Sequence, residues 1–242
     1  AAAEQAVESL ISKVREVPEM AGASFSDTVS TKQTYVVPAV GQKKFQVAAL
    51  DLGIKSMTPH LMAQRGIEVH VVPSNISAED LLAAGPDGIF VSNGPGDPAT
   101  ALHAISLVQA TLDAKRPFFG ICLGMQLLCN SSTEEGLNKG LAFVNANVTK
   151  FKESNIKIPH VGFNQVIANP NSKLFQNIGY GSDFYFTHSY KVTSEENLNQ
   201  SKCIYGQNFI AAFEIENIYA TQFHPELSQN NGLKLLENFL NN

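Results

Sequence analysis

From residue 45 onward, the hydrophobic positions of this 242-residue chain switch between two spacings. Short apolar runs predict buried strands, and stretches with apolar residues three and four apart predict helices. The predicted strands are 45–52, 67–73, 87–96 and 117–121. The predicted helices are 55–66, 77–85, 99–115 and 123–130. Because strands and helices alternate, we expect an α/β fold with a mainly parallel central sheet flanked by helices.

The pattern changes beyond about residue 140. Stretches rich in β-branched and aromatic residues predict further strands, and a final amphipathic stretch predicts a closing helix. These strands fall in residues 142–151, 164–168, 183–192 and 209–223, and the helix in 232–240. We expect the extra strands of this C-terminal half to extend or flank the main sheet.

The first 44 residues differ from the rest of the chain. Residues 4–17 alternate apolar and charged positions at helical spacing and predict a short amphipathic helix. Residues 18–44 carry turn formers and little periodicity, so we expect an extended connecting segment. The sequence therefore predicts an N-terminal appendage, 1–44, and one compact domain, 45–242.

Composition narrows the possible functions. A net charge of -5 with no stripe of Lys and Arg argues against nucleic-acid binding. No apolar run is long enough to span a membrane, and the first residues lack a secretory layout, so we expect a cytoplasmic protein. The 3 cysteines form no C-x-x-C pair, and no phosphate-binding glycine loop is present. We therefore expect no metal and no cofactor.

The stretch GICLG places Cys122 between Gly120 and Gly124, where a strand turns into a helix. This is the spacing of a nucleophile elbow with cysteine in place of serine. The turn would expose the sulfur at the carboxyl edge of the sheet, and the helix N-terminus would stabilise a thiolate. The backbone N–H of Leu123 is a candidate oxyanion donor. Alternatively, Cys122 is a small buried apolar residue, as free cysteines usually are.

Two other stretches carry candidate chemistry. In SNGPGDP, glycines on both sides of Pro95 make a rigid turn, with Gly96 a candidate oxyanion donor and Gly94 shaping the loop. In QFHPE, His224 and Glu226 are two residues apart and would point the same way from an extended segment. An imidazole beside a carboxylate can act as a general base. An ordinary tight turn and a structural histidine remain the alternatives.

A nucleophile, an oriented base and an oxyanion loop together indicate acyl transfer through a covalent thioester. The motifs NGPGDP, GICLGMQ and FHPE, in that order, resemble those of the triad (class I) glutamine amidotransferases. This resemblance implies the flavodoxin-like fold of that class. It also implies hydrolysis of L-glutamine to glutamate, with ammonia passed to a synthase partner. A cysteine peptidase or another thiol hydrolase on a related fold matches these motifs less closely.

The resemblance also implies roles for individual residues. Cys122 would be the nucleophile, His224 the general base and then acid, and Glu226 the group that orients His224. Gly96 and Leu123 would supply the oxyanion N–H groups. The residues expected to bind glutamine are Gly94, Gln126, His188, Ser189 and Tyr190.

The two halves of the chain resemble different members of the class. The front, with AALDLGIK and SNGPGDPAT, is similar to the small subunit of carbamoyl-phosphate synthetase. From about Gly124 onward, PHVGFNQV, THSYKV and ATQFHPELS are similar to the glutaminase subunit of imidazole glycerol phosphate synthase. We therefore hypothesise a chimera joined near residues 124–140, which two parents sharing one fold would allow. A catalytically weak or inactive scaffold is then the alternative to an active glutaminase.

Overall fold

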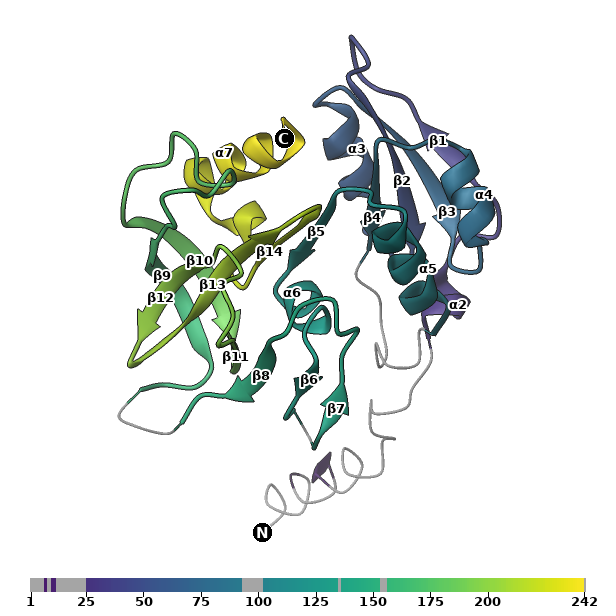
Figure 1. Ribbon diagram of the computed structural model, residues 1–242. Helices are drawn as coiled ribbons and strands as arrows, with labels where there is room; N and C mark the ends of the chain where they lie inside the picture. Colours follow the sequence, from purple (N-terminus) through teal and green to yellow (C-terminus); the bar gives the residue numbers. More distant parts are fainter. Residues whose placement is uncertain are drawn as a thin grey trace. The chain divides into compact units, whose positions relative to one another are not determined.

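The computed structural model describes residues 7, 10–11, 25–92, 102–134, 136–152 and 156–241. The chain forms two compact units that divide between Ala114 and Lys115 (Figure 1). Most of the predicted helix 4–17 lies outside the described residues. Within the described ranges, no helix combines the length and apolar character needed to cross a membrane.

The first unit is built on a four-stranded sheet with the order β1-β3-β2-β4. Strands β3, β2 and β4 are parallel, as predicted, while β1 is antiparallel to β3. The strands are β1 (Tyr35–Val37), β2 (Phe45–Asp51), β3 (Ile67–Pro73) and β4 (Gly88–Val91). The helices are α2 (Ser26–Val29), α3 (Met57–Ala63), α4 (Ala78–Ala83) and α5 (Leu102–Asp113).

Helices cover both faces of this sheet, because neighbouring residues of β2 point to opposite sides. Ala49 belongs to an apolar cluster with Ala63 of α3. Leu50 belongs to a second cluster with Leu81 of α4 and Leu107 of α5. The predicted arrangement of helix, sheet and helix layers is therefore present in this unit.

The segment 25–44 is more ordered than the sequence suggested. Its strand β1 pairs with β3, with Val36 opposite His70. The backbone N–H of Thr31 donates to the buried carboxylate of Asp51 at 2.8 Å. The expectation of an extended connecting segment is therefore wrong for Ser26–Val29, which forms the helix α2. Strand β1 was not predicted, because the short run Tyr35–Val37 gains its partner only in the folded chain. The proposed domain boundary at residue 44 stays a prediction.

The second unit contains a ten-stranded, mainly antiparallel sheet (Figure 1). Eight strands follow the order β10-β9-β12-β13-β11-β8-β6-β7, and β14 joins β13 to β5. The first five by number are β5 (Phe118–Ile121), β6 (Ser131–Ser132), β7 (Asn138–Lys139), β8 (Asn147–Lys150) and β9 (His160–Ile167). The others are β10 (Ser182–His188), β11 (Tyr190–Thr193), β12 (Ser201–Tyr205), β13 (Gln207–Ile215) and β14 (Ile218–Thr221). The helices are α6 (Leu123–Leu127), a 3₁₀ turn η2 (Pro225–Leu227) and α7 (Gln229–Leu240).

The predicted strands of the C-terminal half are present, with differences in detail. The stretch 183–192 is two strands, because the chain breaks pairing at Ser189 between β10 and β11. Strand β12 was not predicted, since its polar residues give only a short alternation. Helix α6 ends at Leu127, three residues earlier than predicted, and leads into a turn that contacts residues 140–144.

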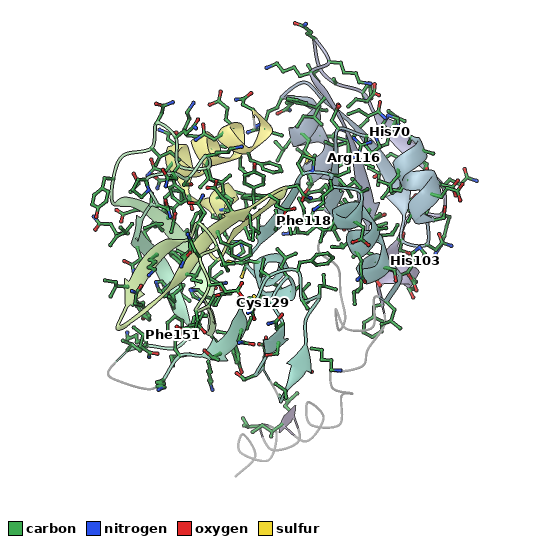
Figure 2. The ribbon with its side chains drawn as sticks, viewed as in Figure 1. His70, His103, Arg116, Phe118, Cys129 and Phe151 are labelled. Atoms are coloured by element: carbon green, nitrogen blue, oxygen red, sulfur yellow. The ribbon has the colours of Figure 1, made fainter. Side chains whose placement is uncertain are left out.

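Aromatic side chains fill the core of the second unit. Phe184 and Phe186 of β10 are fully buried, as is Phe223 beyond β14. Leu235 of α7 packs into the same cluster, as does Phe151, which Figure 2 labels. This core fixes β10 and the end of β14 relative to each other, which matters below because both lead to candidate site residues.

Two histidines are buried together at the edge of this core. The Nδ1 of His160 lies 3.0 Å from the Nε2 of His188, and the ring of His160 stacks on Tyr205 and Phe186. Burial lowers the pKa of each histidine from 6.5 to about 4, so both rings are neutral near pH 7. The two residues are 28 positions apart, and no local sequence pattern links them.

The turn between β5 and α6 depends on one of its two glycines. A Cβ at Gly120 would lie 2.9 Å from the backbone C and O of Gly124, closer than folded proteins tolerate. A Cβ at Gly124 would meet nothing within 4 Å. Gly120 therefore relieves crowding at this turn, whereas the space around Gly124 does not require a glycine.

We predict that Gly120→Ala destabilises the second unit by about 2 kcal/mol, because the new methyl group forces β5 and α6 apart. The matched substitution Gly124→Ala should be neutral or stabilising by about 0.5 kcal/mol, since alanine favours a helix and has space there. Urea unfolding of both variants and the parent chain checks this. Equal losses for the two alanines would contradict it.

We also predict that the free energy of unfolding falls as the pH drops from 7 to 5. An unfolded histidine binds its proton near pH 6.5, whereas folded His160 and His188 do so only near pH 4. Protons therefore favour the unfolded chain in this window, by on the order of 1–2 kcal/mol for each histidine.

The variant His160→Gln, which keeps a donor for His188, should show a shallower fall. His60→Gln, at an exposed position of α3, is the matched control and should follow the parent chain. Parallel pH curves for the parent and His160→Gln, measured by urea unfolding, would show that the prediction is wrong.

Candidate active site

Cys122 occupies the sharp turn between β5 and α6. Its backbone has φ 51° and ψ -104°, a conformation that non-glycine residues rarely adopt and that is typical of strained functional positions. The side chain is partly exposed, so the buried alternative for this cysteine does not apply. The backbone N–H of Cys122 donates to the carbonyl of Thr221 at 2.8 Å, which continues the pairing of β5 with β14.

The parallel register of β5 and β14 brings two distant stretches together. Ile121 lies opposite Thr221, so the next residues along each strand, Cys122 and Gln222, are neighbours. Two positions further on, the backbone N–H of His224 donates to the carbonyl of Tyr185 at 2.8 Å. The end of β14 is thus held between β5 and β10, which delivers His224 to the side of the cysteine.

His224 and Glu226 form an ion pair, with 2.7 Å between Nδ1 and a carboxylate oxygen. The predicted extended segment was wrong, however, because Pro225–Leu227 forms the 3₁₀ turn η2. Proline fixes φ at the first position of this turn. The pair is therefore made across a tight turn, in which the two side chains are held at fixed separation.

The electrostatics of His224 depend on both neighbours. A hydrogen bond with Cys122, the hydrogen bond with Glu226 and the negative charges of both groups raise the pKa of His224 to about 10. Burial of the ring opposes this shift and is overcome. The Nε2 atom is buried and makes no hydrogen bond of ordinary geometry among the described residues. Catalytic hydrogen bonds are often long or poorly aligned before substrate binds, and the pKa of His224 reflects its proximity to Cys122.

A buried polar network surrounds the sulfur. The Nε2 of Gln222 donates to Sγ at 3.6 Å, and the carbonyl of Thr187 lies 3.9 Å from Sγ. The Nε2 of Gln126 donates to the Oε1 of Gln222 at 3.0 Å and to the carbonyl of Tyr190 at 3.3 Å. Gln126 is thus linked to the sulfur through Gln222, and its side chain is largely buried.

The stretch THSYKV was expected to supply three glutamine-binding residues, His188, Ser189 and Tyr190. These residues lie next to this network. His188 is buried, and its Nδ1 donates to the carbonyl of Tyr190 at 2.6 Å. Ser189 and Tyr190 are partly exposed. Both ring nitrogens of His188 are therefore engaged inside the protein, one with Tyr190 and one with His160.

The candidate oxyanion donors are only partly described. Leu123 follows the elbow as the first residue of α6, with an exposed side chain. Gly94 and Gly96 lie outside the described residues, so their expected roles stay predictions. No group of three or more His, Cys, Asp or Glu side chains suited to a metal ion occurs within the part of the chain that the structure describes.

The other two cysteines differ from Cys122. Cys129, labelled in Figure 2, and Cys203 are both fully buried. Burial raises the pKa of each thiol to about 12. They behave as small core residues, which leaves Cys122 as the accessible thiol.

Sequence reasoning missed Gln222 as a member of this region. Gln222 stands inside the quoted motif QFHPE, but a lone glutamine at a strand end carries no signal of its own. The register of the parallel strands β5 and β14 places Gln222 beside Cys122. The local sequence does not determine that register.

The profile of the family described as Glutamine amidotransferase class-I matches residues 48–242 of this chain. A carbamoyl phosphate synthase small chain from Streptomyces coelicolor is 58% identical over 119 residues, which are 49% of this chain and 31% of that protein. The imidazole glycerol phosphate synthase subunit HisH 1 from Campylobacter jejuni is 47% identical over 135 residues, 55% of this chain and 67% of that subunit. This chain therefore spans under a third of the length of the synthase small chain that it matches.

Solved structures share the fold. The glutaminase domain of Trypanosoma brucei CTPS, solved with bound acivicin, superposes with a TM-score of 0.55 at 16% sequence identity. The match covers 82% of this chain and 94% of that domain. The profile match over most of the sequence and this superposition together confirm the expected fold class. The chain belongs to the class-I glutamine amidotransferase family.

Proposed function

We propose that this chain hydrolyses the side-chain amide of L-glutamine to give glutamate and ammonia. The observation that carries the proposal is His224 itself, which is paired with Glu226 at 2.7 Å and whose pKa is raised to about 10 by hydrogen bonds with Cys122 and Glu226. A thiolate beside an imidazolium is the resting form of an activated cysteine nucleophile. Membership of the class-I family supports the same reaction.

The proposed reaction has two halves. The Cys122 thiolate attacks the amide carbon, the C–N bond breaks, and the Nε2 proton of His224 goes to the nitrogen, which leaves as ammonia. Water then attacks the γ-glutamyl thioester while His224 accepts its proton, and the C–S bond breaks to release glutamate and the thiolate. Glu226 stabilises the charged imidazole each time it forms.

The remaining site residues keep their proposed roles. Leu123 and Gly96 would donate backbone N–H groups to the oxyanion, with Gly94 shaping the loop. Ser189 and Tyr190 would contact the α-amino-acid end of glutamine. Both Nε2 protons of Gln126 are used inside the protein, so its contact with substrate would fall to Oε1. His188 would act by shaping this wall of the pocket.

We propose a synthase subunit as the acceptor of the ammonia. An apolar face supports a protein partner: on β9 and the neighbouring β12, exposed side chains alternate with buried ones. The apolar ones among them are Val161, Phe163, Ile167 and Ile204, each at least 41% accessible, and the polar ones are Gln165 and Lys202. Neither nucleic acid nor a membrane is part of the proposal, and the cytoplasmic location stays a prediction.

The composite origin of the chain also stays a proposal. It has support in the two kinds of relative, a synthase small chain and a HisH subunit, each matching about half of this chain. If the joint loosens the triad, the chain is a scaffold with little turnover, since a misplacement of about 1 Å can cost about a hundredfold in rate.

We predict that the purified chain forms glutamate from glutamine and that Cys122→Ala lowers this rate by at least about a thousandfold, because no other group replaces the sulfur. Cys203→Ala removes a thiol from the core and serves as the matched control, which should retain most of the activity once folding is verified by circular dichroism. An equal background rate in the parent and Cys122→Ala would instead support the inactive scaffold.

Thiol labelling gives an independent prediction. A glutamine-like electrophile at pH 7 should modify Cys122 at least about tenfold faster than Cys129 or Cys203, whose thiols are buried and protonated. Mass spectrometry of peptides from the labelled chain locates the modification. Similar labelling of all three cysteines in the folded chain would contradict the assignment of Cys122 as the activated thiol.

A further inference from the structure

The side chain of Gln222 is fully buried and directed at the sulfur of the proposed nucleophile. It follows the last residue of β14, and its backbone N–H donates to the carbonyl of Ala211 at 2.8 Å. Its Nε2 lies 3.6 Å from the Sγ of Cys122. A buried amide in this position either donates to the sulfur or, if reversed, presents its oxygen to it, and the two orientations have opposite effects on a thiolate.

The surrounding hydrogen bonds settle which way the amide points. The carbonyl of Tyr190 can only accept, so the group of Gln126 that faces it must be the NH₂. The second proton of that NH₂ then points to Gln222, whose amide oxygen must accept it. The NH₂ of Gln222 is left to face Sγ. One backbone carbonyl therefore sets the polarity of two consecutive side-chain amides.

The same carbonyl is held from the other side. The Nδ1 of His188 donates to the carbonyl of Tyr190 at 2.6 Å, so the Nε2 of His188 must accept from the Nδ1 of His160. Because burial keeps both histidines neutral near pH 7, this second chain keeps its direction over the working pH range. The carbonyl is thus fixed by two donors, and the amide chain that starts from it has no reversed alternative of equal energy.

We propose that Gln222 is a further catalytic residue, whose amide N–H stabilises the Cys122 thiolate, and that Gln126 is a positioning residue that orients it. The catalytic meaning of this inference rests on the proposed glutaminase function. The donor favours the ionised sulfur before attack, and it stabilises the same thiolate as the leaving group when water cleaves the thioester. It lies on the strand side of the sulfur, as a contact additional to the imidazole of His224.

The test measures ionisation of the sulfur without requiring glutamine. In the full chain, the rate of Cys122 alkylation by iodoacetamide is followed against pH, with mass spectrometry to exclude Cys129 and Cys203. In Gln222→Met, which keeps the volume but loses the donor, we expect the midpoint of this curve to rise by about one pH unit. Thr221→Val, an isosteric change at the adjacent buried residue, is the matched control and should not move the midpoint.

Two further variants keep the test decisive if Gln222→Met does not fold. Gln222→Glu is isosteric and replaces the donor by an acceptor, so the midpoint should rise at least as far. Gln126→Met leaves Gln222 free to turn, and it should raise the midpoint although residue 126 does not contact the sulfur. A merely structural role would lower stability in these variants, as in Thr221→Val, without moving the curve.

The outcomes separate the two proposals. A midpoint that stays within about 0.2 pH units of the Thr221→Val value in the folded variants overturns the role of Gln222, even if the parent chain hydrolyses glutamine. A raised midpoint in the Gln222 variants, combined with a parent chain that shows no glutaminase activity, supports the amide donor and counts against the proposed function alone. A raised midpoint together with a loss of glutamate formation of about tenfold or more supports both.

Discussion

The parallel pairing of β5 with β14 is the contact on which the candidate site depends. Its register places Ile121 opposite Thr221, and the pairing continues for one more hydrogen bond, from Cys122 to Thr221. The strained turn that carries the sulfur thus begins where β14 presents Gln222 and then turns toward His224. A slip of one residue would reverse the faces of β14 and remove the glutamine from the sulfur.

The site combines backbone strain with buried polar groups, and both need a rigid setting. A positive φ at a non-glycine residue costs on the order of 1–3 kcal/mol, and the surrounding structure must supply it. At Cys122, the pairing of β5 with β14 behind the turn and the close approach of α6 at Gly120 hold the strained backbone in place. The aromatic core around Phe184 and Phe223 holds β10 against the end of β14, so His224 is fixed from the opposite side.

The donor-to-acceptor direction of each buried hydrogen bond depends on the whole polar network. A single acceptor, the carbonyl of Tyr190, decides the orientation of Gln126 and the tautomer of His188. Fully satisfied networks of this kind specify one arrangement, because any reversed member would leave two like groups facing each other in the interior. That carbonyl belongs to the first residue of β11, directly after the break between β10 and β11 at Ser189.

The sequence by itself determined the local features of this protein. The spacing of apolar residues indicated strands β2, β3 and β4 and helices α3, α4 and α5 of the first unit, Gly120 marked the turn at Cys122, and Pro225 fixed the short path from His224 to Glu226. Only the tertiary structure decided the pairing of β14 with β5, the edge strand at Tyr35–Val37 and the chain of donors that ends at the sulfur. The physical reason is range. Propensities and turns act over a few residues, whereas the β5–β14 register and the buried hydrogen bonds of Gln126 and Gln222 depend on partners 64 to 100 residues away along the chain.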